Sequence, residues 1–157
     1  MIEDLQELMR ALPEVLQWLG VMVAGAVPFV ESYFGSVIGI VAGVDPVVAV
    51  AAAITGNALS MLVLVLGAGS VRRRVRGERP APSGRRARLK RAFDRYGVAG
   101  VSLLGQSVLP SQITSMAMVS FGASVRAVVL WQSVSIVLWG VAFGTAAALG
   151  VDLLSGG

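Results

Sequence analysis

The sequence predicts an all-α integral membrane protein built as an inverted repeat, in which each half has a re-entrant helical hairpin followed by a transmembrane helix. Three observations support this fold class. Hydrophobic residues make up 55% of the 157-residue chain. Residues 47–71 and 127–151 are uncharged runs, each long enough to cross a bilayer. Each half also contains a second apolar segment, interrupted in its middle by proline and polar residues.

The N-terminal segment predicts an amphipathic helix that lies on the membrane surface. Apolar residues recur at helical spacing over 2–19, and the acidic residues fall mostly on the opposite face. Trp18 is suited to the membrane interface, where its ring and its N–H meet different environments. Pro13 either kinks this helix or starts a new one.

The first interrupted segment covers residues 15–44 and is broken by Pro28, Glu31 and Ser32. As one straight helix it would reach about 45 Å, against a hydrocarbon core of about 30 Å. Split at the break, neither piece spans comfortably. A tilted, kinked span remains an alternative, but the polar tip favours a re-entrant hairpin.

The first predicted transmembrane helix covers residues 47–71. Asp45 and Pro46 are typical of a helix start, with a carboxylate at the N-cap and proline in the first turn. Asn57 lies inside this run. A lone asparagine in a transmembrane helix more often makes an interhelical hydrogen bond than a substrate contact.

The basic residues are concentrated between the two halves. Eleven of the thirteen Lys and Arg residues lie between Arg72 and Arg95. A basic segment flanked by apolar runs is typical of a cytoplasmic loop beside anionic lipid headgroups, and nucleic acid is not an expected partner. Residues 85–96 predict a short amphipathic helix with Leu89 and Phe93 facing lipid.

The second interrupted segment covers residues 97–123, and polar groups gather in its middle. These are Gln106, Ser107, Pro110, Ser111, Gln112, Thr114 and Ser115. Arg126 then precedes the second predicted span. We therefore expect a single membrane domain over 1–157, with a first repeat over 1–71, the basic loop and amphipathic helix over 72–95, and a second repeat over 96–157.

Two topologies fit this pattern. If the interrupted segments re-enter, each half crosses once, the second half is inverted, both termini lie outside and the basic loop lies inside. If they span, each half crosses twice, the repeats are parallel and both termini lie inside. Each topology leaves one arginine misplaced, Arg10 in the first and Arg126 in the second. Segment length and polar placement favour the inverted form.

Glu31 is the main candidate for a functional group, because an ionisable residue at membrane depth is costly to keep. Its alternatives are a position at an aqueous rim and a structural pair with Arg126, which is itself suited to an anionic headgroup or to snorkelling. Helix N-termini after Pro28 and Pro110 would favour an anionic ligand. The candidate substrate or proton pathway contains Pro28, Glu31, Ser32, Asn57, Gln106, Ser107, Pro110, Ser111, Gln112, Thr114 and Arg126.

The chain has no cysteine and no histidine. Disulfides, thiolate chemistry and imidazole acid–base catalysis are therefore excluded. We expect no enzyme, no catalytic residue, no metal site and no cofactor, because a single carboxylate makes a poor active site.

Several short motifs resemble a known family. They are VPFVES at 27–32, the Gly-Asn pair in the first predicted span, RYGVAG at 95–100 and the proline-centred second hairpin. Over most of residues 20–150 the chain resembles the small multidrug export protein family, and its architecture is similar to the wider DedA (SNARE-associated, VTT-domain) group. That resemblance implies two opposed re-entrant helices in a bacterial plasma membrane, and movement of polyprenyl phosphates or phospholipids.

In this resemblance Glu31 matches the acidic position beside the first proline, and Pro110 matches the proline of the second hairpin. The second hairpin reads LPSQIT where the family more often has a second proline and a Thr-Gly pair. The second acidic residue of the DedA pattern has no counterpart inside the predicted membrane segments. These departures distinguish the chain from the proton-driven pattern of that group.

The function expected from these features is a multi-pass membrane transporter, or a lipid flippase or scramblase, that moves a small amphipathic or anionic lipid-like substrate, with proton coupling as one form. A non-transporting membrane scaffold or insertase-like protein is the alternative. A homodimer is expected because two spans enclose little volume.

Overall fold

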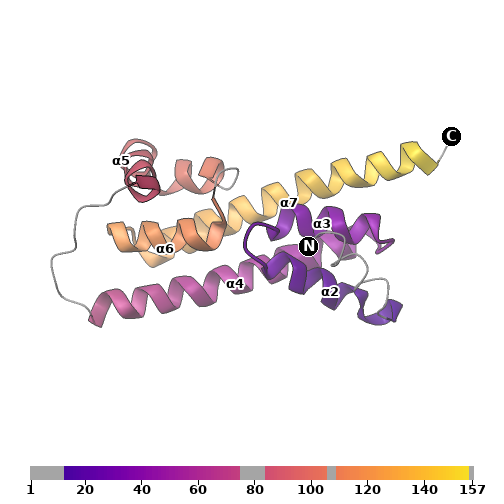
Figure 1. The fold of residues 1–157 in the computed structure, drawn as a ribbon, viewed down its shortest axis with the longest axis horizontal. Coiled ribbons are helices and arrows are strands. Elements are labelled where there is room, and N and C mark those ends of the chain that lie inside the picture. Colours follow the sequence, from indigo (N-terminus) through magenta and orange to yellow (C-terminus); the bar gives the residue numbers. More distant parts are fainter. Residues whose placement is uncertain (1–12, 75–83, 106–108, 156–157) are drawn as a thin grey trace. The chain divides into compact units, whose positions relative to one another are not determined.

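The computed structural model describes residues 13–74, 84–105 and 109–155, and these residues form helices without any strand. In order they are α2 (Glu14–Ala26), α3 (Glu31–Val41), α4 (Pro46–Arg74), α5 (Gly84–Gly105), α6 (Ser111–Phe121) and α7 (Val125–Ser155) (Figure 1). The predicted all-α class is confirmed. The part of the predicted surface helix over 2–12 lies outside the described residues. Its remainder, residues 14–19, belongs to α2, which begins directly after Pro13.

The chain divides into two compact units. The first contains α2, α3, the part of α4 up to Leu59 and the part of α7 from Ile136. The second contains the rest of α4, all of α5 and α6, and α7 up to Ser135. Each unit therefore combines one helical hairpin with one part of each long helix.

The two long helices are the membrane-span candidates. Pro46–Gly67 in α4 and Val125–Leu154 in α7 are long and apolar enough to cross a membrane. Asp45 caps α4, since its Oδ1 accepts hydrogen bonds from the main-chain N–H groups of Val47 and Val48 at 2.9 and 3.1 Å. The predicted helix start at Asp45 and Pro46 is confirmed.

In the first unit, α2 and α3 pack side by side as a hairpin (Figure 1). Small residues permit close approach of these helices to α4. A Cβ atom added at Gly25 would lie 2.8 Å from Ala53 Cα, and one added at Gly56 would collide with the main-chain oxygen of Met22. The backbones of α2 and α4 are therefore in contact at both glycines.

In the second unit, α5 is broken at Gly97, which has φ 67° and ψ −168°. The predicted amphipathic helix ends at this break, and residues 98–105 form the first arm of a hairpin with α6. Phe93, predicted to face lipid, is half-buried, and its ring centre lies 5.9 Å from that of Phe121 on α6. A left-handed glycine is the residue best suited to such a sharp turn.

The ends of α3 and α6 have the same local geometry. Gly43 and Gly122 both have positive φ, at 95° and 117°. In each case the glycine N–H bonds a carbonyl three residues back, and the next N–H bonds one five residues back, as in a Schellman ending. The two halves, predicted to share a sequence pattern, therefore also share their backbone geometry at these two glycines.

Candidate functional site

The first hairpin tip contains Glu31, the first residue of α3. Pro28 and Phe29 are exposed in the turn after α2, whereas the Glu31 side chain is fully buried. Phe29 and Glu31 have φ values of 73° and 55°, in the left-handed region that non-glycine residues rarely adopt. Strain of this kind persists where the surrounding structure enforces it, and it clusters at functional sites.

Behind Glu31, α3 directs a hydroxyl face towards α7. Ser32 Oγ donates a hydrogen bond to the main-chain oxygen of Ile136 at 2.8 Å. A Cβ atom added at Gly140 would lie 3.2 Å from Ser32 Cβ, so α7 approaches α3 closely at this glycine. Asn57, on α4 of the same unit, is also fully buried. The first unit thus contains Glu31, Ser32 and Asn57 as buried polar groups.

Tyr33 is the aromatic neighbour of this tip. Its ring centre lies 4.8 Å from that of Phe34 and 5.5 Å from that of Phe143 on α7. The contact with Phe143 packs α3 on α7 beside the first hairpin tip.

The second hairpin tip is uncharged and polar. Its described candidates Pro110, Ser111, Gln112 and Thr114 are all buried. Gln112 Nε2 donates a hydrogen bond to Ser60 Oγ on α4 at 3.0 Å. The predicted residues Gln106 and Ser107 lie outside the described residues. The buried part of this tip can bind a ligand through hydrogen bonds but holds no group that would titrate near neutral pH.

The sequence interpretation missed a buried polar cluster in the second unit, formed by Ser102, Gln132 and Ser135. Ser135 Oγ donates to the main-chain oxygen of Ser102 at 2.8 Å. Within the described part of the chain, Ser102 Oγ and Gln132 Oε1 are buried without a hydrogen-bond partner. The three-residue spacing of Gln132 and Ser135 places them on one helix face, a signal that was available in the sequence.

Arg126 follows the first residue of α7 and its side chain is exposed. It has no ion-pair partner among the residues that the structure describes. The exposed position fits the interpretation of Arg126 as a headgroup-binding or snorkelling residue.

No protein-family model matches this sequence, and no curated protein or solved structure has significant similarity to it. The resemblance to small multidrug export proteins consequently remains a prediction from short motifs.

Proposed function

We propose that the protein is a membrane transporter or lipid flippase that moves a small amphipathic, anionic substrate, and that Glu31 carries its charge-coupling step. The observation that carries this proposal is the full burial of the Glu31 side chain at the strained tip of a short apolar hairpin. A carboxyl group buried in such a place is costly, and ionisable residues at membrane depth are typically kept for a function. An enzymatic role is not proposed, because one carboxylate without a nucleophile is a poor active site.

The surfaces of α4 and α7 support membrane insertion. In the most apolar stretch of each span candidate, only 33% of the residues in α4 and 22% of those in α7 are buried. Most side chains of these stretches are therefore at least partly exposed. Val63 on α4 is 69% exposed and Leu138 on α7 is 56% exposed. A core helix of a water-soluble protein would bury such side chains, whereas lipid can cover them.

The lengths of the hairpin helices support re-entry. α2 has 13 residues, and α3 and α6 have 11 each. A membrane-crossing helix needs about 20 residues. We therefore propose the inverted arrangement, with both termini outside, the basic segment 72–95 in the cytoplasm and the single domain 1–157 in a bacterial plasma membrane. Two span candidates per chain favour a homodimer.

In the proposed mechanism the two tips have different tasks. Glu31 takes up a proton when its tip is open to one side and releases it on the other, so that its charge changes with access. The hydroxyl and amide groups of Ser111, Gln112 and Thr114 hold the polar head of the substrate. These side chains are uncharged, so they would offer hydrogen bonds to a substrate head that is itself charged.

The test is flux in liposomes under a pH gradient, with a fluorescent anionic phospholipid as the probe. We expect Glu31→Gln to abolish the pH dependence of flux, because an amide cannot titrate. Asp152→Asn, which neutralises an exposed carboxylate on α7, is the matched control and should leave flux unchanged. Circular dichroism and gel filtration check that both variants fold. A folded Glu31→Gln with normal pH-dependent flux would contradict the assignment.

Topology has a separate test, because the chain has no cysteine of its own. Single cysteines at positions 2 and 156 should react with an impermeant maleimide on intact cells. A cysteine at position 79 should react only after the cells are opened. Protection of both terminal positions would overturn the inverted arrangement.

A further inference from the structure

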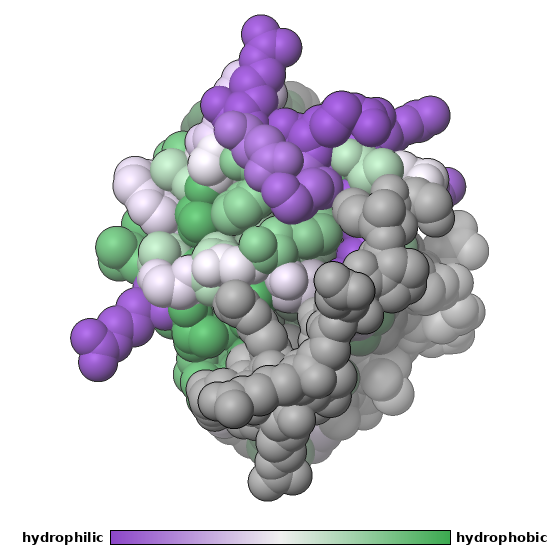
Figure 2. Space-filling model, turned by 90° about the vertical axis from the view of Figure 1, so that its left-hand side faces the viewer, coloured by the Kyte–Doolittle hydropathy of each residue, from purple (hydrophilic) through white to green (hydrophobic). Residues whose placement is uncertain are grey.

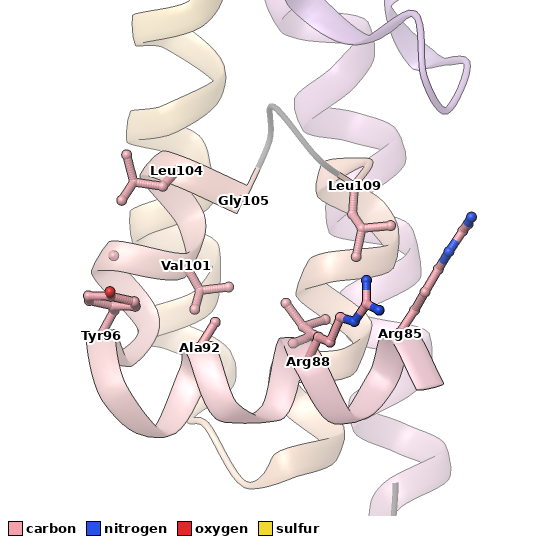
Figure 3. Close-up of a pocket in the computed structure, with 10 residues that line it drawn as sticks. Arg85, Arg88, Ala92, Tyr96, Val101, Leu104, Gly105 and Leu109 are labelled. Atoms are coloured by element: carbon pink, nitrogen blue, oxygen red, sulfur yellow. The ribbon is translucent and has the colours of Figure 1, made fainter. Parts of the chain in front are cut away.

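A cavity of about 470 Å³ lies in the second unit, between the amphipathic part of α5 and the hairpin arm after Gly97 (Figure 3). The helix before the break forms one side, and Val101, Leu104 and Leu109 contribute apolar side chains to the other. This volume is within the range of about 300–1,000 Å³ that small-ligand sites occupy.

The α5 side chains that line the cavity share one helical face. They are Arg85, Arg88, Leu89, Ala92 and Tyr96, at spacings of three, four, seven and eleven residues from the first. Positive charge therefore gathers at one end of this face, and apolar and aromatic groups gather at the other. None of the described lining residues carries a carboxylate.

The two lining arginines differ from their neighbours in how they are engaged. Arg86 donates to Ser120 Oγ at 2.9 Å and lies 5.5 Å from the centre of the Phe121 ring. Lys90 pairs with Asp94. Arg85 and Arg88 have no hydrogen-bond or ion-pair partner in the part of the chain that is described.

The close-up shows Arg88 reaching towards Leu109, while Arg85 extends outward at the rim, away from the apolar lining (Figure 3). Figure 2 shows that hydrophilic side chains gather on the surface of α5, directly beside hydrophobic surface. Two guanidinium groups that have no counter-ion among the described residues, at the end of an apolar cavity, are suited to a phosphate, which arginine binds through paired hydrogen bonds.

We propose that this cavity binds one anionic phospholipid, with its phosphate on Arg85 and Arg88 and the start of its acyl chain along Val101, Leu104 and Leu109. Free phosphate would satisfy the arginines but would leave the apolar wall uncovered, so the lining favours a lipid. This inference rests on the proposed function, because it assumes that the protein lies in a membrane. It adds the chemistry of the lipid headgroup and a binding site separate from Glu31.

The test is native mass spectrometry of the full chain released from phosphatidylcholine nanodiscs that contain a small fraction of phosphatidylglycerol. We expect retention of one phosphatidylglycerol per chain, and at least a tenfold loss of retention in Arg88→Gln. Ala92→Phe, which fills the cavity without changing charge, should cause a similar loss. The matched control is Arg91→Gln, which removes the same charge from a position of α5 that does not line the cavity, and it should retain the lipid.

Three outcomes would overturn the proposal. Equal loss in Arg91→Gln would mean diffuse attraction to the basic surface. Equal retention of phosphatidylcholine would mean that the arginines do not select the headgroup. Displacement of the lipid by millimolar inorganic phosphate would identify a soluble anion as the ligand. Glu31→Gln should still retain the lipid, so that a failure of the transport proposal and a failure of this one are distinguishable.

Discussion

Ser36 Oγ donates a hydrogen bond to the main-chain oxygen of Ser32 at 2.6 Å, and Ser115 Oγ donates to that of Ser111 at 2.5 Å. Ser115 lies 79 residues after Ser36, and Gly122, which ends α6, lies 79 residues after Gly43, which ends α3. The hydroxyl bonds and the helix endings therefore repeat with the same sequence spacing. Back-bonding of this kind satisfies a hydroxyl group within its own helix. α3 and α6 thus share both their internal hydroxyl bonds and their endings, although their residues differ.

The shared endings give the first prediction. Gly43→Ala and Gly122→Ala should each destabilise the protein by about 1–2 kcal/mol, because alanine is strained at positive φ. An added Cβ at Gly43 would meet no atom within 4 Å, so strain and not a clash is the expected cause there. Unfolding in mixed micelles measures the change. Gly150→Ala, in α7 and equally open, should be neutral or stabilising; equal losses at all three positions would contradict the prediction.

The second prediction concerns the contact of α2 with α4. Gly56→Ala should destabilise the protein by about 1–3 kcal/mol, because the added methyl group would overlap the Met22 carbonyl group and force the helices apart. Gly67→Ala in the same helix meets nothing within 4 Å and should gain about 1 kcal/mol from helix propensity. Thermal unfolding of the two variants in one detergent measures the difference, and equal effects would contradict the close packing of α2 on α4.

Much of the fold was predictable because it depends on local chemistry. Asp45 and Pro46 specify a helix start through capping and a fixed φ, and the uncharged runs that follow predict long helices by length alone. The turn around Pro28 was predictable for the same reason. These features need no knowledge of what packs against them.

The remaining features depend on contacts between residues distant in sequence. Phe93 has an apolar side chain on an amphipathic helix, which suggested lipid contact, but only the fold brings it to Phe121. The cavity above Arg88 exists because Gly97 reverses the chain, and a glycine alone does not specify the direction of that turn. The Ser102 cluster was missed because single serines in apolar helices are common and usually bond within their own helix.

That cluster gives the third prediction. Ser102→Ala should be neutral or slightly stabilising, because it removes a buried hydroxyl oxygen that has no hydrogen-bond partner among the described residues. Ser135→Ala should cost about 0.5–1.5 kcal/mol, since it removes the bond to the Ser102 carbonyl group. Denaturation in mixed micelles separates the two. A larger loss in Ser102→Ala would mean that its hydroxyl group makes a bond that the structure lacks.

The last prediction addresses the strain at the first hairpin tip. Phe29 has φ 73° and is 60% exposed, so its conformation is imposed by the turn and not by burial of its ring. Phe29→Gly and Phe29→Ala remove the same ring, but only glycine adopts this φ without strain. The glycine variant should therefore be more stable than the alanine variant by about 1–2 kcal/mol, the reverse of their order inside a helix. Unfolding curves for both variants in the same detergent give this difference. An alanine variant as stable as the glycine variant would mean that position 29 is unstrained, and it would remove strain at this residue as support for a functional tip.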